Sequence, residues 1–165
     1  MARPAVLAPA GLAFSAILWL GLLLGVSFLA TPVKFEAASL TLPVALDVGR
    51  VTFALFSKVE WAMAALTTAC FLAARPGRFP AIAVSLLVAL LALQSIWLLP
   101  ILDARLGAVI AGTPPPPSSH HVIYVAVEGV KALLLTGLGL SALRGVATGA
   151  IQAGEAGRRT SEGRA

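Results

Sequence analysis

The sequence predicts an all-α polytopic membrane protein, in which a bundle of four transmembrane helices is joined by interfacial connections. Three observations predict this class. Hydrophobic residues make up 59% of the 165 residues and charged residues only 12%, whereas charged residues are about a quarter of an ordinary soluble domain. The mean hydropathy is +0.95. The apolar residues form four runs, each long enough to cross a bilayer as a helix.

The first run, from about residue 9 to residue 29, follows a short N-terminus that carries one basic residue, Arg3. A signal peptide has the same outline, but an apolar run of about 20 residues exceeds the usual signal core and no Ala-x-Ala-like cleavage site follows it. We therefore expect an uncleaved transmembrane helix. Gly21 and Gly25 form a GxxxG step, which we expect to pack within the chain.

Residues 31–50 mix proline and charged residues with apolar ones, which predicts a connection along the membrane interface. Alternating apolar residues between 40 and 48 leave extended and helical forms open; we favour a short interfacial helix that runs into the second span. That span, residues 51–74, carries Lys58 and Glu60 inside its apolar length. A charge at the centre of a membrane helix costs at least about 2.5–3.5 kcal/mol, so both charges need a partner or water.

After a tight turn at residues 75–80, the third span covers about residues 81–99 and contains Gln94. A helical extension should follow and break at Gly112, and four prolines at 114–117 predict a stiff spacer. The fourth span covers residues 121–143. We expect residues 1–150 to form a single transmembrane domain and residues 151–165 to form a disordered cytoplasmic tail.

The distribution of Lys and Arg predicts the orientation. Seven of them lie on the side shared by the termini and the turn at 75–80, and three lie in the connections on the other side. Because cytoplasmic loops carry the excess of positive charge, both termini are expected in the cytoplasm. The predicted location is the inner (plasma) membrane of the cell, which the chain crosses several times.

The polar residues within the spans predict one layer at similar depth in the outer half of the membrane. Lys58 follows Arg50 by eight residues, and Glu128 follows His120 by eight in a parallel span. In one interpretation, Glu128 pairs with Lys131 on its own helix while Lys58 reaches toward the headgroups. In the other, an outward-facing polar pocket binds a ligand. Its candidate residues are Lys58, Glu60, Gln94, Tyr124, Glu128 and Lys131. In that interpretation we expect Glu128 to pair with Lys58.

Several function classes are disfavoured by the sequence. The net charge of +5 is scattered at the ends of the spans, so we expect no nucleic-acid partner. Cys70 is the only cysteine, and the adjacent His120 and His121 have no acidic cluster beside them, so we predict neither a metal site nor a cofactor. Because no nucleophile elbow, phosphate loop or zinc motif is present, we expect no enzyme and no catalytic residues.

Short motifs lie at the ends of the spans. They are Gly25-Val-Ser-Phe28 with Thr31-Pro-Val-Lys-Phe35 and the run from Gly49 to Phe56, Leu93-Gln94-Ser-Ile-Trp-Leu-Leu-Pro100 with Asp103-Ala-Arg105, and His121-Val-Ile-Tyr124. In these motifs the sequence resembles the TMEM205-like (DUF4149) family of four-span membrane proteins. The resemblance implies a four-helix membrane fold and a role in transport or export-linked processes, with no catalytic residues to transfer. The sequence departs from the family pattern at residues 57–60 and at Glu128.

Two function classes remain open. The first is solute or lipid handling by a homo-oligomer through the outward-facing pocket, since four short spans hardly enclose a pathway alone. The second is a non-catalytic structural or accessory subunit of a larger membrane complex, packed through small-residue faces of the second and third spans. These faces comprise Ala65, Ala69, Ala73, Ala81, Ser85 and Ala89. The expected partners are the lipid bilayer and either further copies of this chain or other membrane subunits.

Overall fold

The computed structural model describes residues 3–162, and every regular element in this part of the chain is helical. Rod 1 comprises α1 (Arg3–Leu23), the π-helical turn η1 (Leu24–Ala30), α2 (Thr31–Val33) and the 3-10 turn η2 (Lys34–Glu36). Rod 2 is α3 (Leu42–Ala74). Rod 3 comprises α4 (Arg78–Leu93), the π-helical turn η3 (Gln94–Leu98) and α5 (Leu99–Ile110), and rod 4 is α6 (His120–Glu162).

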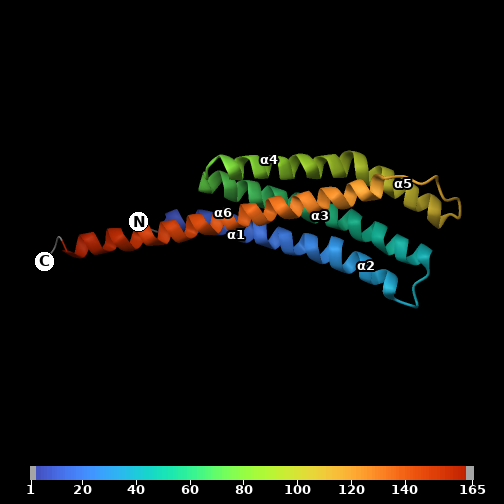
Figure 1. Cartoon of the computed structure of the whole chain (residues 1–165), viewed down its shortest axis with the longest axis horizontal. Helices are drawn as coiled ribbons and strands as arrows, with labels where there is room; N and C mark the ends of the chain where they lie inside the picture. Colours follow the sequence, from blue (N-terminus) through green and yellow to red (C-terminus); the bar gives the residue numbers. More distant parts are fainter. Residues whose placement is uncertain (1–2, 163–165) are drawn as a thin grey trace.

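The four rods form a bundle in which neighbours in the chain are neighbours in space. Rod 1 packs on rods 2 and 4, and rod 3 packs on the same two rods. Both termini and the α3–α4 turn lie toward one end of the bundle, while the other two connections lie at the opposite end, which we call the distal end (Figure 1). Since α3 and α6 are not among the closely packed pairs, rods 2 and 4 face each other diagonally.

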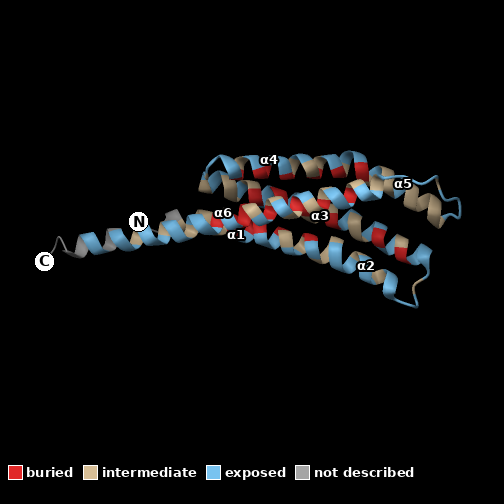
Figure 2. Cartoon of the chain, in the orientation of Figure 1, coloured by how far each residue is buried: buried red, intermediate tan, exposed pale blue. Residues whose placement is uncertain are grey.

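Small residues bring α1 and α6 together in the most extensive helix contact of the bundle. Ala13 and Ala16 are buried, and a Cβ atom added at Gly139 would lie 3.2 Å from Cγ1 of Ile17. Small residues allow this close approach between membrane helices. Buried residues face inward, and the two rods diverge toward the distal end (Figures 1 and 2). This divergence leaves space between the rods at that end.

Each rod contains a segment that is long and apolar enough to cross a membrane. The four segments are Val6–Glu36, Leu42–Ala74, Arg78–Ile110 and His120–Glu155. Large apolar side chains point away from the bundle; Leu7, Leu72 and Leu133, for example, are 67%, 63% and 75% exposed. A bilayer is the environment in which such a surface is stable. The predicted all-α fold with four spans is therefore confirmed.

The helices extend further than the sequence analysis predicted. Rod 1 continues to Glu36, and α3 begins at Leu42 and runs without a break into the second span, so the helix expected to run into that span is present as the first turns of α3. The extension after Pro100 ends at Ile110, before Gly112, as predicted. The helix α6 runs to Glu162, so the predicted disorder does not hold for residues 151–162; residues 163–165 lie outside the described residues.

The GxxxG step on rod 1, with Gly21 in α1 and Gly25 in η1, does not pack within the chain. A Cβ atom at Gly21 or Gly25 would meet nothing within 4 Å, because the face of α1 that contacts α6 carries Ala13 and Ala16 instead. Both glycines line a shallow apolar groove on the outside of the bundle. The expectation of packing within the chain is therefore wrong.

Candidate functional site

Three charged side chains meet in the interior of the bundle, and we call Glu60, Glu128 and Lys131 the charge layer. They are only 3%, 1% and 0% exposed. The Lys131 ammonium lies 2.6 Å from Oε1 of Glu60 and 2.8 Å from Oε1 of Glu128. The pair with Glu128 links two residues three apart on α6, whereas the pair with Glu60 crosses the diagonal of the bundle to α3. One cation therefore serves two buried carboxylates from two rods.

Neutral side chains donate further hydrogen bonds to both carboxylates. Trp19 on α1 donates its indole N–H to Oε1 of Glu60 at 3.0 Å. Gln94 donates to Oε1 of Glu128 at 2.8 Å, and the Ser27 hydroxyl donates to Oε2 of Glu128 at 3.0 Å. Burial of a charge is tolerated when it is paired and hydrogen-bonded. All four rods therefore contribute to one hydrogen-bonded cluster.

Both π-helical turns supply donors to Glu128, since Ser27 lies in η1 and Gln94 is the first residue of η3. Each turn ends two residues before a proline, Pro32 or Pro100. A proline inside a helix removes one hydrogen bond and its ring collides with the carbonyl four residues earlier. A locally wider turn relieves this conflict, and such turns are frequent at functional sites. The prolines thus account for the placement of two donors opposite one carboxylate.

Lys58 does not take part in the charge layer. Its side chain is exposed, and it forms no ion pair with any side chain that the structure describes. Two residues correspond to about 200° around a helix, so Lys58 points away from the interior when Glu60 points inward. The hypothesis that Glu128 pairs with Lys58 is wrong, because rods 2 and 4 are diagonal and only an inward-facing side chain of α3 reaches α6. The pairing of Glu128 with Lys131 is confirmed.

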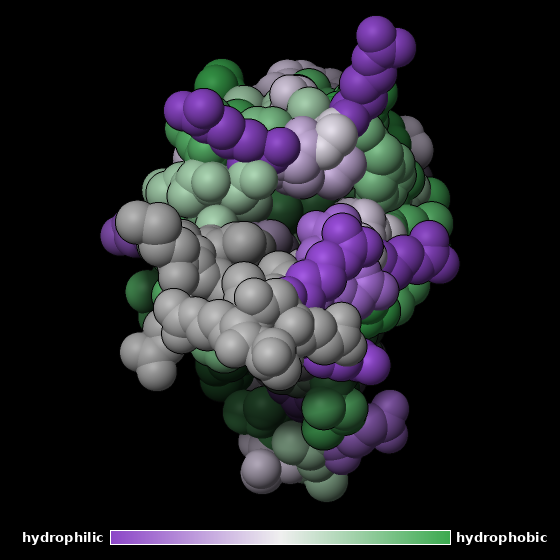
Figure 3. Space-filling view, turned by 90° about the vertical axis from the view of Figure 1, so that its left-hand side faces the viewer, coloured by the Kyte–Doolittle hydropathy of each residue, from purple (hydrophilic) through white to green (hydrophobic). Residues whose placement is uncertain are grey.

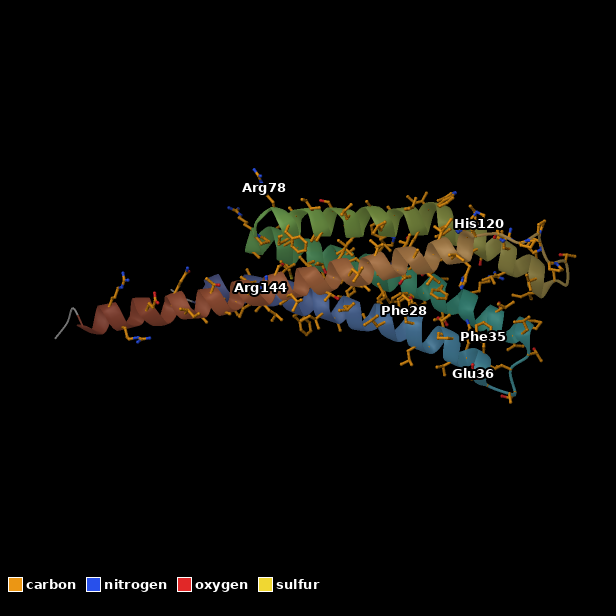
Figure 4. All side chains as sticks on the ribbon, viewed as in Figure 1. Phe28, Phe35, Glu36, Arg78, His120 and Arg144 are labelled. Carbon is orange, nitrogen blue, oxygen red and sulfur yellow. The ribbon has the colours of Figure 1, made fainter. Side chains whose placement is uncertain are left out.

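A cavity of about 850 Å³ lies between the charge layer and the distal end of the bundle, and it is bordered by all four rods. We call it the distal cavity. Its walls are largely apolar, and Figure 4 shows Phe28 and Phe35 on rod 1 at the end where α6 begins with His120, away from Arg78. The large apolar residues that line the cavity include Phe28, Phe35, Leu46, Phe53, Leu99, Leu102, Leu106, Val109 and Val125.

The structure divides the six predicted site residues into three groups. Tyr124 and Glu128 line the distal cavity. Tyr124 is buried and its ring meets the edge of Phe53, with 5.4 Å between centroids. Glu60, Gln94 and Lys131 lie in the cluster around the charge layer, which forms the floor beneath the cavity. Lys58 is the third group by itself: it is exposed and lies outside both the cavity lining and the cluster.

Basic side chains line the distal cavity where the sequence analysis proposed no site residue. They are Lys34, Arg50 and Arg105. Arg50 pairs with Asp103 across rods 2 and 3 at 2.7 Å. Arg105 donates a hydrogen bond to the carbonyl oxygen of Pro116. These three are the only Lys and Arg residues of the two connections at the distal end. The sequence analysis used them to predict the orientation and did not consider them as site residues.

Sequence analysis also missed Trp19 and Ser27. A tryptophan in an apolar run is usually a packing residue, and the hydroxyl of a single serine in a membrane helix can donate a hydrogen bond to a backbone carbonyl of its own helix. Their roles depend on the rods that pack against them, which no local pattern specifies.

This arrangement is suited to binding a small molecule. The cavity is largely apolar, basic side chains line it, and the hydrogen-bonded cluster around the charge layer closes its inner end. A comparison with family models, with curated proteins and with solved structures found no match to this chain. Membership of the TMEM205-like family stays a prediction.

Proposed function

We propose that this protein binds an amphipathic molecule with one apolar chain in the distal cavity, and that it handles such molecules at the membrane. The observation that carries this proposal is the combination of mostly apolar walls with Lys34, Arg50 and Arg105 in the same cavity. A volume of about 850 Å³ lies within the range of about 300–1,000 Å³ that is typical of ligand pockets. An apolar chain would pack on the phenylalanine and leucine side chains, with its polar head near the cations.

The proposed orientation places the cavity on the outer side of the membrane. Hydrophilic side chains gather at the end of the bundle that carries the termini and the α3–α4 turn (Figure 3), and this agrees with the excess of Lys and Arg on that side. By the positive-inside rule that end faces the cytoplasm. The distal cavity then opens outward, as the sequence analysis expected for a polar pocket.

Filling the cavity is expected to weaken binding of a single-chain lipid. We choose Ala54→Trp together with Val125→Trp, because both residues line the cavity from opposite rods. The added indole rings would occupy the space of the chain. Lysophosphatidylcholine and lysophosphatidate are added to the purified protein in detergent, and 1:1 adducts are measured by native mass spectrometry. The apparent Kd of at least one lipid should rise about tenfold or more, which corresponds to about 1.4 kcal/mol.

The matched control replaces the neighbouring Leu55 and the nearby Val122 with Trp on the same two helices. Both side chains are exposed and lie outside the lining, so this variant should bind as the unmodified protein does. If neither lipid forms a saturable adduct, or if both double variants lose binding equally, the proposed function is wrong.

An accessory role in a larger membrane complex is the second candidate. The small-residue faces of α3 and α4 are left uncovered by the bundle: Ala65, Ala69, Ala73, Ser85 and Ala89 are exposed and Ala81 is half-buried. Small residues on a lipid-facing surface permit another helix to approach closely. Purification in a mild detergent distinguishes the candidates, since stoichiometric co-purification of other chains would favour this role and a defined homo-oligomer would favour the first.

A further inference from the structure

We infer that the ligand of the distal cavity carries an anionic head group, and that Lys34 and Arg105 recognise it. This inference rests on the proposed function and adds the chemical class of the ligand. Lys34 lies at the end of rod 1 and Arg105 lies on α5, so the two cations reach the same cavity from different rods.

The charges around the cavity do not balance. Of its three Lys and Arg residues, Arg50 is already paired with Asp103 at 2.7 Å. The other carboxylate in the lining, Glu128, is paired with Lys131 at 2.8 Å, a cation that it shares with Glu60. Among the side chains that the structure describes, no carboxylate lies within 4.0 Å of the Lys34 or Arg105 side chain. Two cations are therefore left without an acidic partner in a mostly apolar chamber.

The local packing holds Lys34 at the cavity. Its ammonium lies against Gly49, where an added Cβ atom would overlap Nζ. It also lies 5.0 Å from the centroid of the Phe35 ring, a distance at which a cation is attracted to an aromatic face. The absence of a side chain at Gly49 thus creates the space that the ammonium occupies. Neither contact neutralises the charge.

Arg105 is oriented as well. One of its guanidinium nitrogens donates to the carbonyl oxygen of Pro116, in the proline-rich connection before α6. Guanidinium has five N–H donors in a planar fork, which matches phosphate and carboxylate oxygens. The contact with Pro116 uses only part of this capacity, so the remaining donors are available for an anion.

The floor of the cavity excludes an anion from the deeper position. Glu128 accepts hydrogen bonds from Ser27, Gln94 and Lys131, so its oxygens are already occupied, and its negative charge repels an anionic head. The head group therefore lies near Lys34 and Arg105, and the chain packs against the apolar walls. A phosphate monoester on a single acyl chain has this chemistry.

The experiment compares lysophosphatidate with lysophosphatidylcholine of the same chain length, which differ only in the head group, by native mass spectrometry of the full chain in detergent. We expect lysophosphatidate to bind on the order of tenfold more tightly. Replacing both cations, as Lys34→Gln with Arg105→Gln, should weaken binding of lysophosphatidate more than binding of lysophosphatidylcholine and so remove this preference. The control Lys58→Gln removes an exposed cation outside the lining, and it should keep the preference.

Equal affinity for the two lipids, or tighter binding of lysophosphatidylcholine, would overturn the inference. In that case cavity-filling substitutions would still block both lipids if the proposed function holds, so the two failures are distinguishable. A third measurement adds millimolar inorganic phosphate as competitor. We expect it to displace little lysophosphatidate, because phosphate lacks the chain; complete displacement would identify a free-phosphate site and overturn the assignment to a lipid. Loss of the preference in Lys58→Gln would assign it to nonspecific surface charge.

Discussion

Replacing Lys131 with methionine is expected to destabilise the bundle more than any other single substitution considered for this chain. Lys131 is fully buried and, among the side chains that the structure describes, is the one cation that contacts Glu60 and Glu128. Its removal leaves two carboxylates close together without a counter-charge in an apolar interior. Breaking a buried ion pair by removing one partner typically costs about 3–5 kcal/mol. The Lys131→Met variant should therefore show a large fall in Tm and in the yield of folded protein in detergent.

Two further variants separate the loss of pairing from the loss of side-chain packing. Lys58→Met changes the same residue type on the exposed side of α3, and its Tm should stay close to that of the unmodified protein. Adding Glu60→Gln and Glu128→Gln to Lys131→Met removes the buried negative charges, so part of the lost stability should return. An equal effect of Lys131→Met and Lys58→Met would show that the charge layer does not stabilise the bundle.

The second large effect is expected at the contact between α1 and α6. Gly139 is buried, and an added Cβ atom would lie 3.2 Å from Cγ1 of Ile17 and 4.0 Å from Cβ of Ala16. A leucine at this position would separate the two helices, and overpacking of this kind costs about 1–3 kcal/mol. Thermal unfolding of Gly139→Leu in detergent should show a corresponding fall in Tm.

Gly129 provides the matched control on the same helix. A Cβ atom there would meet nothing within 4 Å, so Gly129→Leu should be neutral or slightly stabilising, since leucine favours a helix more than glycine does. If the two variants unfold at the same temperature, α1 and α6 do not approach each other as described.

That Glu60, Gln94 and Glu128 lie at a common level of the bundle could be predicted from the sequence, because their relative level depends only on helical rise and direction. Glu128 and Lys131 are three residues apart, and this spacing places them on one helix face. The choice between Lys58 and Glu60 could not be made in the same way. Both lie in one apolar run, and which of them faces inward depends on the rotation of α3 against its neighbours.

The cavity could not be predicted, since it results from the divergence of rods that contact closely elsewhere. Lys34 and Arg105 are typical of membrane-flanking charges when considered alone. Their common position becomes evident only when rods 1 and 3 extend as helices past the expected ends of the spans, to Glu36 and Ile110. The role of Trp19 as a donor to Glu60 likewise depends on contacts between α1 and α3.

The most direct test of the account is whether a residue in the wall of the distal cavity can be reached by water from outside the cell. With Cys70 replaced by alanine, Ala54→Cys places a thiol in the cavity lining, and Leu55→Cys places one on the outer, lipid-facing surface. A membrane-impermeant maleimide reacts only with a thiol that water can reach and ionise. We predict that intact cells give modification of Ala54→Cys and little modification of Leu55→Cys. Modification of Ala54→Cys only after the cells are opened, or none at all, would contradict an outward-facing cavity.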